Sequence, residues 1–210
     1  MKKLCFVVAV CLSIIGCNSE QLSNVVTSPD GRIVVEVDTT GDGVPCYSLM
    51  FGDEALIEDS PLGIVTSDGD FSMGLQLAGV KHSAANSTWS PVWGERAEVV
   101  DRYNALEATF CDAEQRELKV EFRLYNDGVG FRYHLQGDEG CYVLDESTTF
   151  ALEEDCEAHW IAGSYDDDEY AYMHTPLSGI TREAMALSGN PARQLPYPAV
   201  NTPVAMVTPN

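Results

Sequence analysis

Trp89, Trp93 and Glu95 are the residues best suited by type and spacing to bind a ligand. The two tryptophans lie four positions apart on either side of Pro91, a composition typical of a loop. Aromatic rings stack on the apolar faces of sugar rings, and a neighbouring carboxylate can accept hydrogen bonds from hydroxyl groups. Tryptophan is also often simply buried, and Glu95 could instead form a surface salt bridge. The group therefore predicts a carbohydrate-binding loop, with a structural role as the alternative.

Other arrangements of reactive side chains do not match a known chemistry. Asp38 to Gly43 begins like a calcium-binding EF-hand loop, but Leu49 stands where that loop needs a bidentate glutamate, so a turn is predicted. The run Asp166-Asp167-Asp168-Glu169 reads as a solvated loop, because four adjacent acids cannot all point one way. There is no G-x-S-x-G motif, and the four histidines are scattered. We therefore predict no metal site in this chain and no serine hydrolase chemistry.

The N-terminus reads as an export signal that ends at a lipidated cysteine. Lys2 and Lys3 precede an apolar run from Leu4 to Ile15, which is too short to span a bilayer. Gly16-Cys17 after branched apolar residues resembles a bacterial lipobox. We expect residues 1–16 to be a lipoprotein signal peptide, Cys17 to carry the lipid, and residues 17–27 to form a tether. The protein would be exported, periplasmic or on the cell surface, and lipid-anchored to the membrane; an ordinary signal peptide or an uncleaved anchor is the alternative.

The chain is strongly acidic, with 33 Asp and Glu residues against 12 Lys and Arg and a net charge of −21. Such a surface repels nucleic acid and anionic lipid. We therefore expect no nucleic-acid partner. Neutral sugars, metal ions and basic proteins remain compatible with this charge.

Four cysteines remain if Cys5 and Cys11 leave with the signal peptide and Cys17 is lipidated. Their even number and the oxidising compartment predict two disulfides, for which three connectivities are open. Cys141 and Cys156 enclose the shortest loop, so we favour that pair, and Cys46 with Cys111 follows by elimination. There is no C-x-x-C motif, which argues against zinc.

Short alternating apolar segments separated by turn residues predict an all-β fold. The expected strands are 33–37, 46–51, 71–77, 106–110 and 118–135. A helical pattern occurs only around residues 181–187. Many short strands in one chain are typical of a sandwich or barrel.

Residues 118–135 predict one hairpin in detail. Apolar residues are even-numbered in the first arm and odd-numbered in the second, so both sets share a face only if paired residue numbers have an odd sum. A two-residue loop would set Arg123 opposite Arg132. A four-residue loop from Tyr125 to Gly128 sets Glu121 opposite Arg132, and charge favours this register. Phe122 and Phe131 should then face the same buried side.

An ordered set of short motifs resembles the N-terminal domain of glycoside hydrolase family 97, the family of Bacteroides-type α-glucosidases and α-galactosidases. The resemblance covers about residues 28–210. Its motifs are Ser28-Pro29-Asp30-Gly31, Ser60-Pro61-Leu62-Gly63-Ile64, Trp89-Ser90-Pro91-Val92-Trp93-Gly94-Glu95, the segment from Phe122 to Tyr133, Glu146-Ser147-Thr148-Thr149-Phe150, Trp160 and Asn201-Thr202-Pro203.

The resemblance implies a large antiparallel β-sandwich of the galactose-mutarotase-like type over residues 28–210, incomplete at its C-terminus. It places the catalytic carboxylates in a (β/α)8 barrel that is missing from this chain, so we predict no catalytic residue here and no activity of the chain alone. Calcium is expected only in the full-length enzyme. The implied partners are an α-linked oligosaccharide, the barrel and, through the lipid anchor, the membrane. A free-standing carbohydrate- or protein-binding surface lipoprotein is the competing interpretation.

Overall fold

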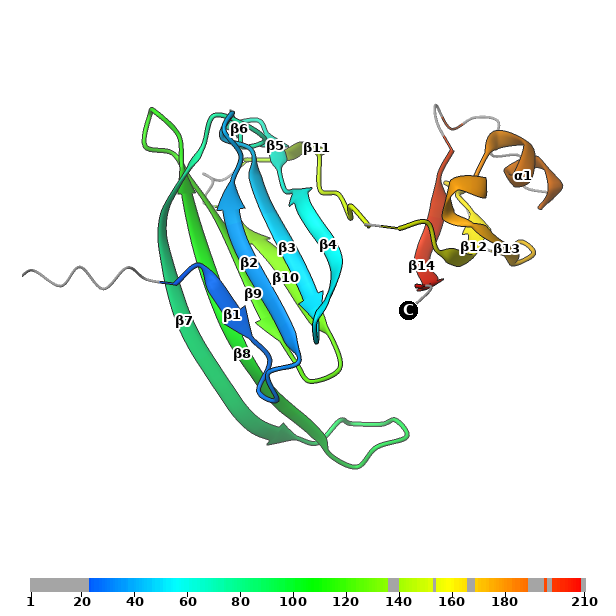
Figure 1. The fold of residues 1–210 in the computed structure, drawn as a ribbon, viewed down its shortest axis with the longest axis horizontal. Helices are drawn as coiled ribbons and strands as arrows, with labels where there is room; N and C mark the ends of the chain where they lie inside the picture. Colours follow the sequence, from blue (N-terminus) through cyan, green and yellow to red (C-terminus); the bar gives the residue numbers. More distant parts are fainter. Residues whose placement is uncertain are drawn as a thin grey trace, which may run out of the picture.

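Two four-stranded antiparallel sheets face each other in the computed structural model (Figure 1). The structure describes residues 23–135, 140–152, 154–165, 169–188, 195 and 198–208. The first sheet contains, in spatial order, β1 (Val25–Thr27), β2 (Ile33–Thr39), β3 (Pro45–Phe51) and β4 (Glu54–Pro61). The second contains β10 (Val129–His134), β9 (Glu117–Leu124), β8 (Val99–Cys111) and β7 (Gln76–Trp89). The predicted all-β antiparallel sandwich is therefore confirmed.

The core between the sheets follows from strict alternation along the strands. In β9, Leu118, Val120, Phe122 and Leu124 are buried, and the residues between them are partly exposed. The rings of Tyr47 from β3 and Phe122 from β9 lie 5.5 Å apart and join the two sheets. One face of each sheet thus forms a common apolar core, while the other face meets solvent.

The predicted hairpin is confirmed residue by residue. Phe131 pairs with Phe122, Arg132 pairs with Glu121, and the amide of Tyr125 donates to the carbonyl of Gly128 across the four-residue loop. The rings of Phe122 and Phe131 are 5.3 Å apart on the core side. A guanidinium nitrogen of Arg132 lies 2.6 Å from the Glu121 carboxylate on the outer face.

A long extended segment follows the hairpin and borders the first sheet. β11 (Val143–Glu146) pairs with β5 (Ile64–Thr66), which also pairs with β6 (Gly69–Asp70). Beyond β11 the chain continues beside β4, where the amide of Thr149 donates to Pro61 and Leu152 bridges to Ile57. Residues 143–152 therefore run antiparallel to residues 57–66, first through the β11–β5 pairing and then through separate backbone hydrogen bonds and one isolated bridge.

The structure contains neither predicted disulfide; Cys46, Cys111, Cys141 and Cys156 are free thiols. Cys141 and Cys156 lie at opposite ends of the extended segment, which spans roughly 30 Å, so the loop between them cannot close. Cys46 and Cys111 neighbour the core residues Tyr47 and Phe110 and therefore point to the outer faces of opposite sheets. Both pairings are therefore absent from the structure: the extended segment separates Cys141 from Cys156, and Cys46 and Cys111 lie on different sheets.

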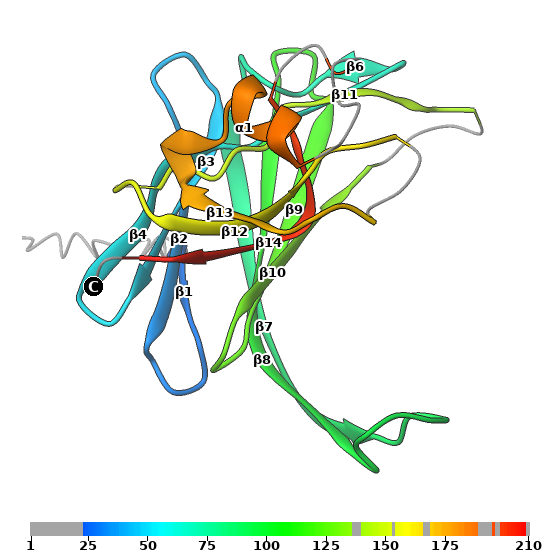
Figure 2. The same cartoon turned by 90° about the vertical axis from the view of Figure 1, so that its right-hand side faces the viewer.

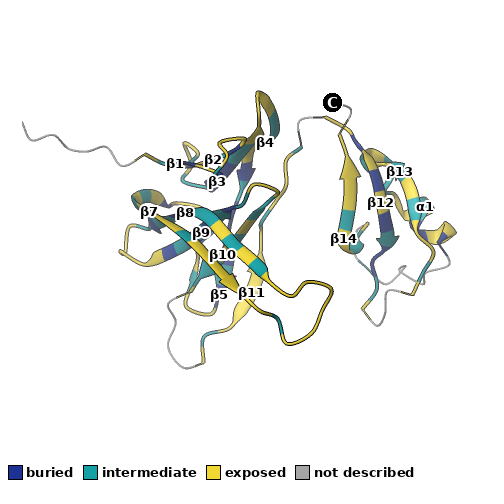
Figure 3. Ribbon diagram, turned by 90° about the horizontal axis from the view of Figure 1, so that it is seen from below, coloured by how far each residue is buried: buried dark blue, intermediate teal, exposed yellow. Residues whose placement is uncertain are grey.

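A second, smaller core lies beyond the extended segment. Its sheet has the order β13 (Met173–Pro176), β12 (Glu157–Ala162) and β14 (Val200–Val207), accompanied by a 3-10 helix, η1 (Leu177–Gly179), and by α1 (Arg182–Leu187). Trp160 is fully buried in this core, where its indole nitrogen donates to Thr175 Oγ1 at 3.0 Å. Buried residues line β12 and exposed residues dominate β14 (Figure 3). The described residues thus form two apolar cores within the range in which one sandwich was expected.

The expected helix is present, whereas the described end of the expected tether is part of the sandwich. Thr181 caps α1 by accepting a hydrogen bond from the amide of Ala184 at 3.2 Å, which fixes the helix start at Arg182. Val25–Thr27 pair with β2, so the sandwich begins inside the expected tether. The predicted signal peptide and Cys17 lie outside the described residues. In the part of the chain that is described, no helix is long and apolar enough to cross a membrane.

Candidate functional site

A two-stranded arm projects from the sandwich and carries the residues that the sequence singled out. β7 and β8 remain paired from Gln76 opposite Cys111 to Trp89 opposite Val99. The half of this ribbon that contains the start of β7 and the end of β8 packs against the core. The other half extends beyond the two sheets (Figures 1 and 2). Such a ribbon exposes both of its faces to solvent beyond the core.

The tip of the arm exposes apolar and aromatic surface. Trp89 ends β7 and is 54% exposed, while Trp93 and Val92 in the connecting loop are 88% and 99% exposed. Glu95 is also exposed, and no described residue forms an ion pair with it. The tip therefore exposes Trp89 at the end of β7, and Trp93 and Glu95 in the loop that follows it. Their role in binding carbohydrate stays a prediction.

The outer face of the arm continues into an aromatic group on the sandwich. Trp89 and Ala85 lie on the same face of β7, and Ala85 pairs with Tyr103 of β8. The Tyr103 ring lies 5.3 Å from that of Tyr125, whose hydroxyl donates to Asp101 Oδ1 at 3.1 Å. This face therefore presents rings and polar oxygens along a line that ends at the tip.

A charged network follows these rings on β9 and β10. Glu121 accepts hydrogen bonds from Nε of Arg123 at 2.9 Å and from Nε of Arg132 at 2.8 Å, and Nε2 of His134 lies 3.2 Å away. Burial alone would raise the pKa of Glu121, but the hydrogen bonds from these three side chains outweigh it and lower the pKa to about 2. Glu121 is therefore a fixed negative charge at neutral pH.

Arg123 connects the charged network to the aromatic group. Its guanidinium carbon lies 4.8 Å from the centre of the Tyr103 ring, a cation–π contact. The hydrogen bond to Glu121 raises the pKa of Arg123 above its ordinary value. The sequence predicted the contact between Glu121 and Arg132 but missed Arg123, His134, Tyr103 and Tyr125. Extending the parity rule of the hairpin to β8 would have placed all of them on this outer face.

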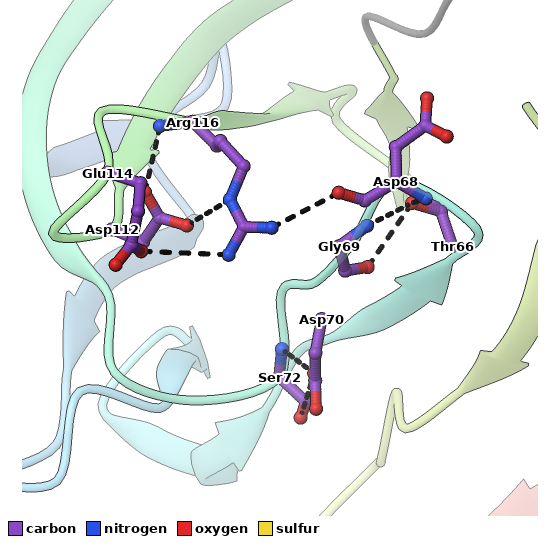
Figure 4. A network of polar contacts seen from close by, with 8 residues as sticks. All are labelled: Thr66, Asp68, Gly69, Asp70, Ser72, Asp112, Glu114 and Arg116. Carbon is purple, nitrogen blue, oxygen red and sulfur yellow. Dashed lines mark hydrogen bonds and ion pairs between the residues drawn. The ribbon is translucent and has the colours of Figure 1, made fainter.

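The acidic residues around the β8–β9 turn serve the fold (Figure 4). Arg116 donates to Asp112 Oδ2 at 2.6 Å and to the carbonyl of Asp68 at 3.1 Å, which ties this turn to the β5–β6 turn. Asp70 caps the following bend by accepting from the amide and hydroxyl of Ser72. Hydrogen bonds from Arg116 outweigh burial and lower the pKa of Asp112. These carboxylates are already engaged by Arg116 and Ser72.

Acidic, histidine and cysteine side chains do not gather into a metal-ligand cluster among the described residues. Among them, no group of three or more His, Cys, Asp or Glu side chains is arranged to hold a metal ion. The segment from Asp38 to Gly43 forms the predicted turn, in which the amide of Gly43 donates to Thr40. Asp166, Asp167 and Asp168 lie outside the described residues.

Comparison with known proteins identifies the family. The model of the glycosyl-hydrolase 97 N-terminal domain matches residues 26–210. A family 97 enzyme from Pseudoalteromonas sp. strain K8, solved in complex with panose, is 31% identical and superimposes with a TM-score of 0.68 over 75% of this chain and 25% of that one. A β-arabinopyranosidase structure, at 28% identity, superimposes with a TM-score of 0.62 over 68% of this chain and 23% of that one.

Curated relatives agree with the structural neighbours. A retaining α-galactosidase from Bacteroides thetaiotaomicron is 24% identical over 75% of this chain and 23% of its own length. A probable retaining α-galactosidase from Streptomyces bingchenggensis is 27% identical over 72% of this chain and 23% of its own length. This chain thus spans about a quarter of each relative. It belongs to glycoside hydrolase family 97 and corresponds to the N-terminal β-sandwich domain of that family.

Proposed function

We propose that this chain is the N-terminal carbohydrate-binding and scaffolding sandwich of an exported α-glycosidase, an α-glucosidase or α-galactosidase, whose catalytic carboxylates lie in a (β/α)8 barrel. The family match and the α-galactosidase relatives support a glycosidase. Two structures of the Pseudoalteromonas enzyme contain panose and acarbose, which supports an α-linked oligosaccharide as the ligand. Calcium remains a prediction for the longer enzyme only.

The exposed tip of the β7–β8 arm is the observation that best supports a carbohydrate-binding role. Trp89 and Trp93 are large apolar side chains that a monomeric domain would ordinarily bury, as it buries Trp160. Stacking an exposed indole ring on another flat apolar surface is favourable because it removes apolar area from water. The faces of pyranose rings offer such a surface. In this proposal the arm holds the oligosaccharide with these rings, and Glu95 accepts hydrogen bonds from its hydroxyl groups.

Oligosaccharide binding by the purified chain tests this role. Adding panose should change the emission of the exposed tryptophans, and Trp93→Ala should remove most of the change by deleting the more exposed ring. Tyr172→Ala is a matched control, because Tyr172 is an aromatic residue that is 73% exposed but lies next to β13, outside the arm. Equal titrations for the parent chain and Trp93→Ala would contradict a binding role for the tip.

Catalysis is assigned to the barrel, so the chain alone should not turn over nitrophenyl α-glucoside or α-galactoside. Glycoside hydrolysis requires two carboxyl groups about 5 to 10 Å apart on opposite sides of the scissile bond. Turnover by the purified chain that is abolished by substituting one of its own acidic residues would refute this assignment.

The competing function is a free-standing carbohydrate- or protein-binding lipoprotein, which the exposed tip also allows. That function requires tight binding of its ligand by this chain alone. A glycosidase domain should bind panose weakly by itself, because the barrel supplies the remaining contacts. The affinity measured in the tryptophan titration therefore separates the two functions.

Export and anchoring rest on the segment around Cys17. We propose that the mature protein begins at a lipidated Cys17 and is held at a membrane surface by that lipid. Mass spectrometry of the mature N-terminus should find a diacylglycerol-modified Cys17. An unmodified start at any other residue would refute the anchor.

A further inference from the structure

A hollow of about 190 Å³ lies on the outer face of the second sheet, away from the tip of the arm. β9 contributes two charged side chains, the following loop one aromatic ring, and β10 a glycine, a phenylalanine and an arginine. The lining residues are Glu121, Arg123, Tyr125, Gly130, Phe131 and Arg132. The hollow is therefore bordered by two guanidinium groups, one carboxylate and one phenol.

The hollow is open because β10 has no side chain at Gly130. Gly130 pairs with Arg123, which places it on the outer face between the two arginines. A Cβ atom built at Gly130 would meet no atom within 4 Å, and its backbone is not in the left-handed region. A larger residue would fit this position without strain and would occupy the hollow.

The charges around the hollow leave hydrogen-bond donors available. Glu121 is 14% exposed and engages Nε of Arg123 together with Nε and Nη2 of Arg132. No described residue accepts a hydrogen bond from the terminal nitrogens of Arg123. Two guanidinium groups thus share one carboxylate, and His134 approaches the same carboxylate.

On the outer face around the hollow, the excess positive charge lies on β9 and β10. Glu107 of β8 lies opposite Glu121, and Lys81 of β7 lies opposite Glu107. The charges of Lys81 and Glu107 therefore balance each other. Lys119 pairs with His134 across β9 and β10, and its charge is balanced by Glu117 at 3.3 Å, so the excess comes from Arg123 and Arg132 against Glu121. In a chain with a net charge of −21, this edge is a local positive region that can attract an anion.

We propose that this hollow binds the carboxylate of an acidic sugar residue such as a hexuronate. Arginine forms two parallel hydrogen bonds to a carboxylate, and the terminal nitrogens of Arg123 provide that geometry. Glu121 and the Tyr125 hydroxyl offer oxygens to sugar hydroxyls nearby. The volume is below the roughly 300 Å³ at which pockets for drug-sized ligands begin, so the hollow fits one sugar residue. This site is independent of the role proposed for Trp89, Trp93 and the barrel.

Titrating the purified chain with D-galacturonate, D-galactose and acetate, followed by amide chemical shifts, tests the site. Galacturonate should shift the signals of Gly130 and its neighbours and should bind about tenfold more tightly than either galactose or acetate. Added salt should weaken this binding, because the contact is between charges near the surface. Equal binding of galacturonate and galactose, or of galacturonate and acetate, would overturn the proposal.

Two glycine substitutions separate filling of the hollow from a general effect on the sheet. Gly130→Ile should abolish galacturonate binding by occupying the hollow while both arginines remain. Gly79→Ile should bind galacturonate like the parent, since Gly79 lies on β7 of the same sheet and also has open space at its Cβ position. Unchanged binding by a folded Gly130→Ile variant would overturn the proposal, as would equal loss in both variants.

Arg123→Lys gives an independent measurement. It keeps the positive charge but removes the planar pair of donors, so galacturonate binding should fall while the melting temperature changes little. Retention of full affinity in Arg123→Lys would refute the role of the Arg123 terminal nitrogens.

Discussion

Phe122 is a core side chain that joins the two sheets of the sandwich. It is fully buried, and its ring lies 5.5 Å from Tyr47 of the opposite sheet and 5.3 Å from Phe131 of the neighbouring strand. Aromatic rings bury large apolar areas, so this one residue stabilises both the hairpin and the contact between the sheets.

We expect Phe122→Ala to lower the free energy of unfolding by about 3–5 kcal/mol, because it leaves a cavity that the surrounding strands cannot fill. Phe150→Ala is the matched control, because Phe150 is 60% exposed beside Phe131 and should cost under about 1 kcal/mol. Urea unfolding of both variants measures the difference. Similar losses for the two would contradict the assigned burial of Phe122.

Glu121 makes stability depend on acid pH. Its pKa falls from 4.5 to about 2 in the folded chain. A carboxylate with a lowered folded pKa contributes stability that is fully present above its unfolded pKa and is lost as pH falls through the folded value. Glu121→Gln should therefore be less stable than the parent at neutral pH, and the gap should close between about pH 4.5 and pH 2. A gap that stays constant over this window in thermal unfolding would contradict the ion pairs.

At the scale of single residues, the sequence predicted what depends on local alternation. The register of Phe122 with Phe131 and of Glu121 with Arg132 follows from parity within one short segment. The Cys141–Cys156 pairing failed because it depends on the path of residues 143–152, which is set by hydrogen bonds to β4 and β5 far away in the sequence. The Cys46–Cys111 pairing failed because the two residues lie on different sheets. The predicted loop contains Trp93, whereas Trp89 is the last residue of β7, and the place of both at the end of a long arm was not visible from composition.

Among the elements, the β7–β8 arm differs from every other strand pair. The other strands of the two large sheets have one face on the core, whereas the arm residues beyond Tyr103 contribute no buried apolar side chain. Its backbone hydrogen bonds are made within the ribbon itself. The arm therefore displays its tip without contributing to the stability of the sandwich.

Shortening the arm tests this separation. Joining Ala85 to Tyr103 through an Asn-Gly turn removes residues 86–102 and keeps the remaining register. We expect the free energy of unfolding to change by less than about 1 kcal/mol and panose binding to be lost. A loss of stability comparable to that of Phe122→Ala would contradict this view of the arm.

At the scale of the whole molecule, the described chain has two separate apolar cores. The larger lies between the two four-stranded sheets, and the smaller surrounds Trp160 on β12 with Met185 of α1. The smaller core contains few buried side chains, and small cores are only marginally stable. The two cores should therefore not unfold as one cooperative unit.

Tryptophan emission can separate the two cores. Trp160 is buried in the smaller core, whereas Trp89 and Trp93 are exposed on the arm and should report little on unfolding. In a variant with Trp89→Phe and Trp93→Phe, we expect the emission of Trp160 to shift at a lower temperature than the loss of far-ultraviolet circular dichroism, which follows the larger sandwich. Coincident transitions would show one cooperative unit and contradict the prediction.

The tip of the arm is also a place where the chain can be interrupted. Residues 92–98 are exposed, and the loop joins two strands that remain paired down to the core, where Leu106 and Phe110 are fully buried. Exposed loop tips of this kind tolerate cuts and new chain ends. Two separately produced pieces divided near Gly94 should therefore find each other and rebuild the sandwich, with the β7–β8 ladder acting as the recognition surface between them.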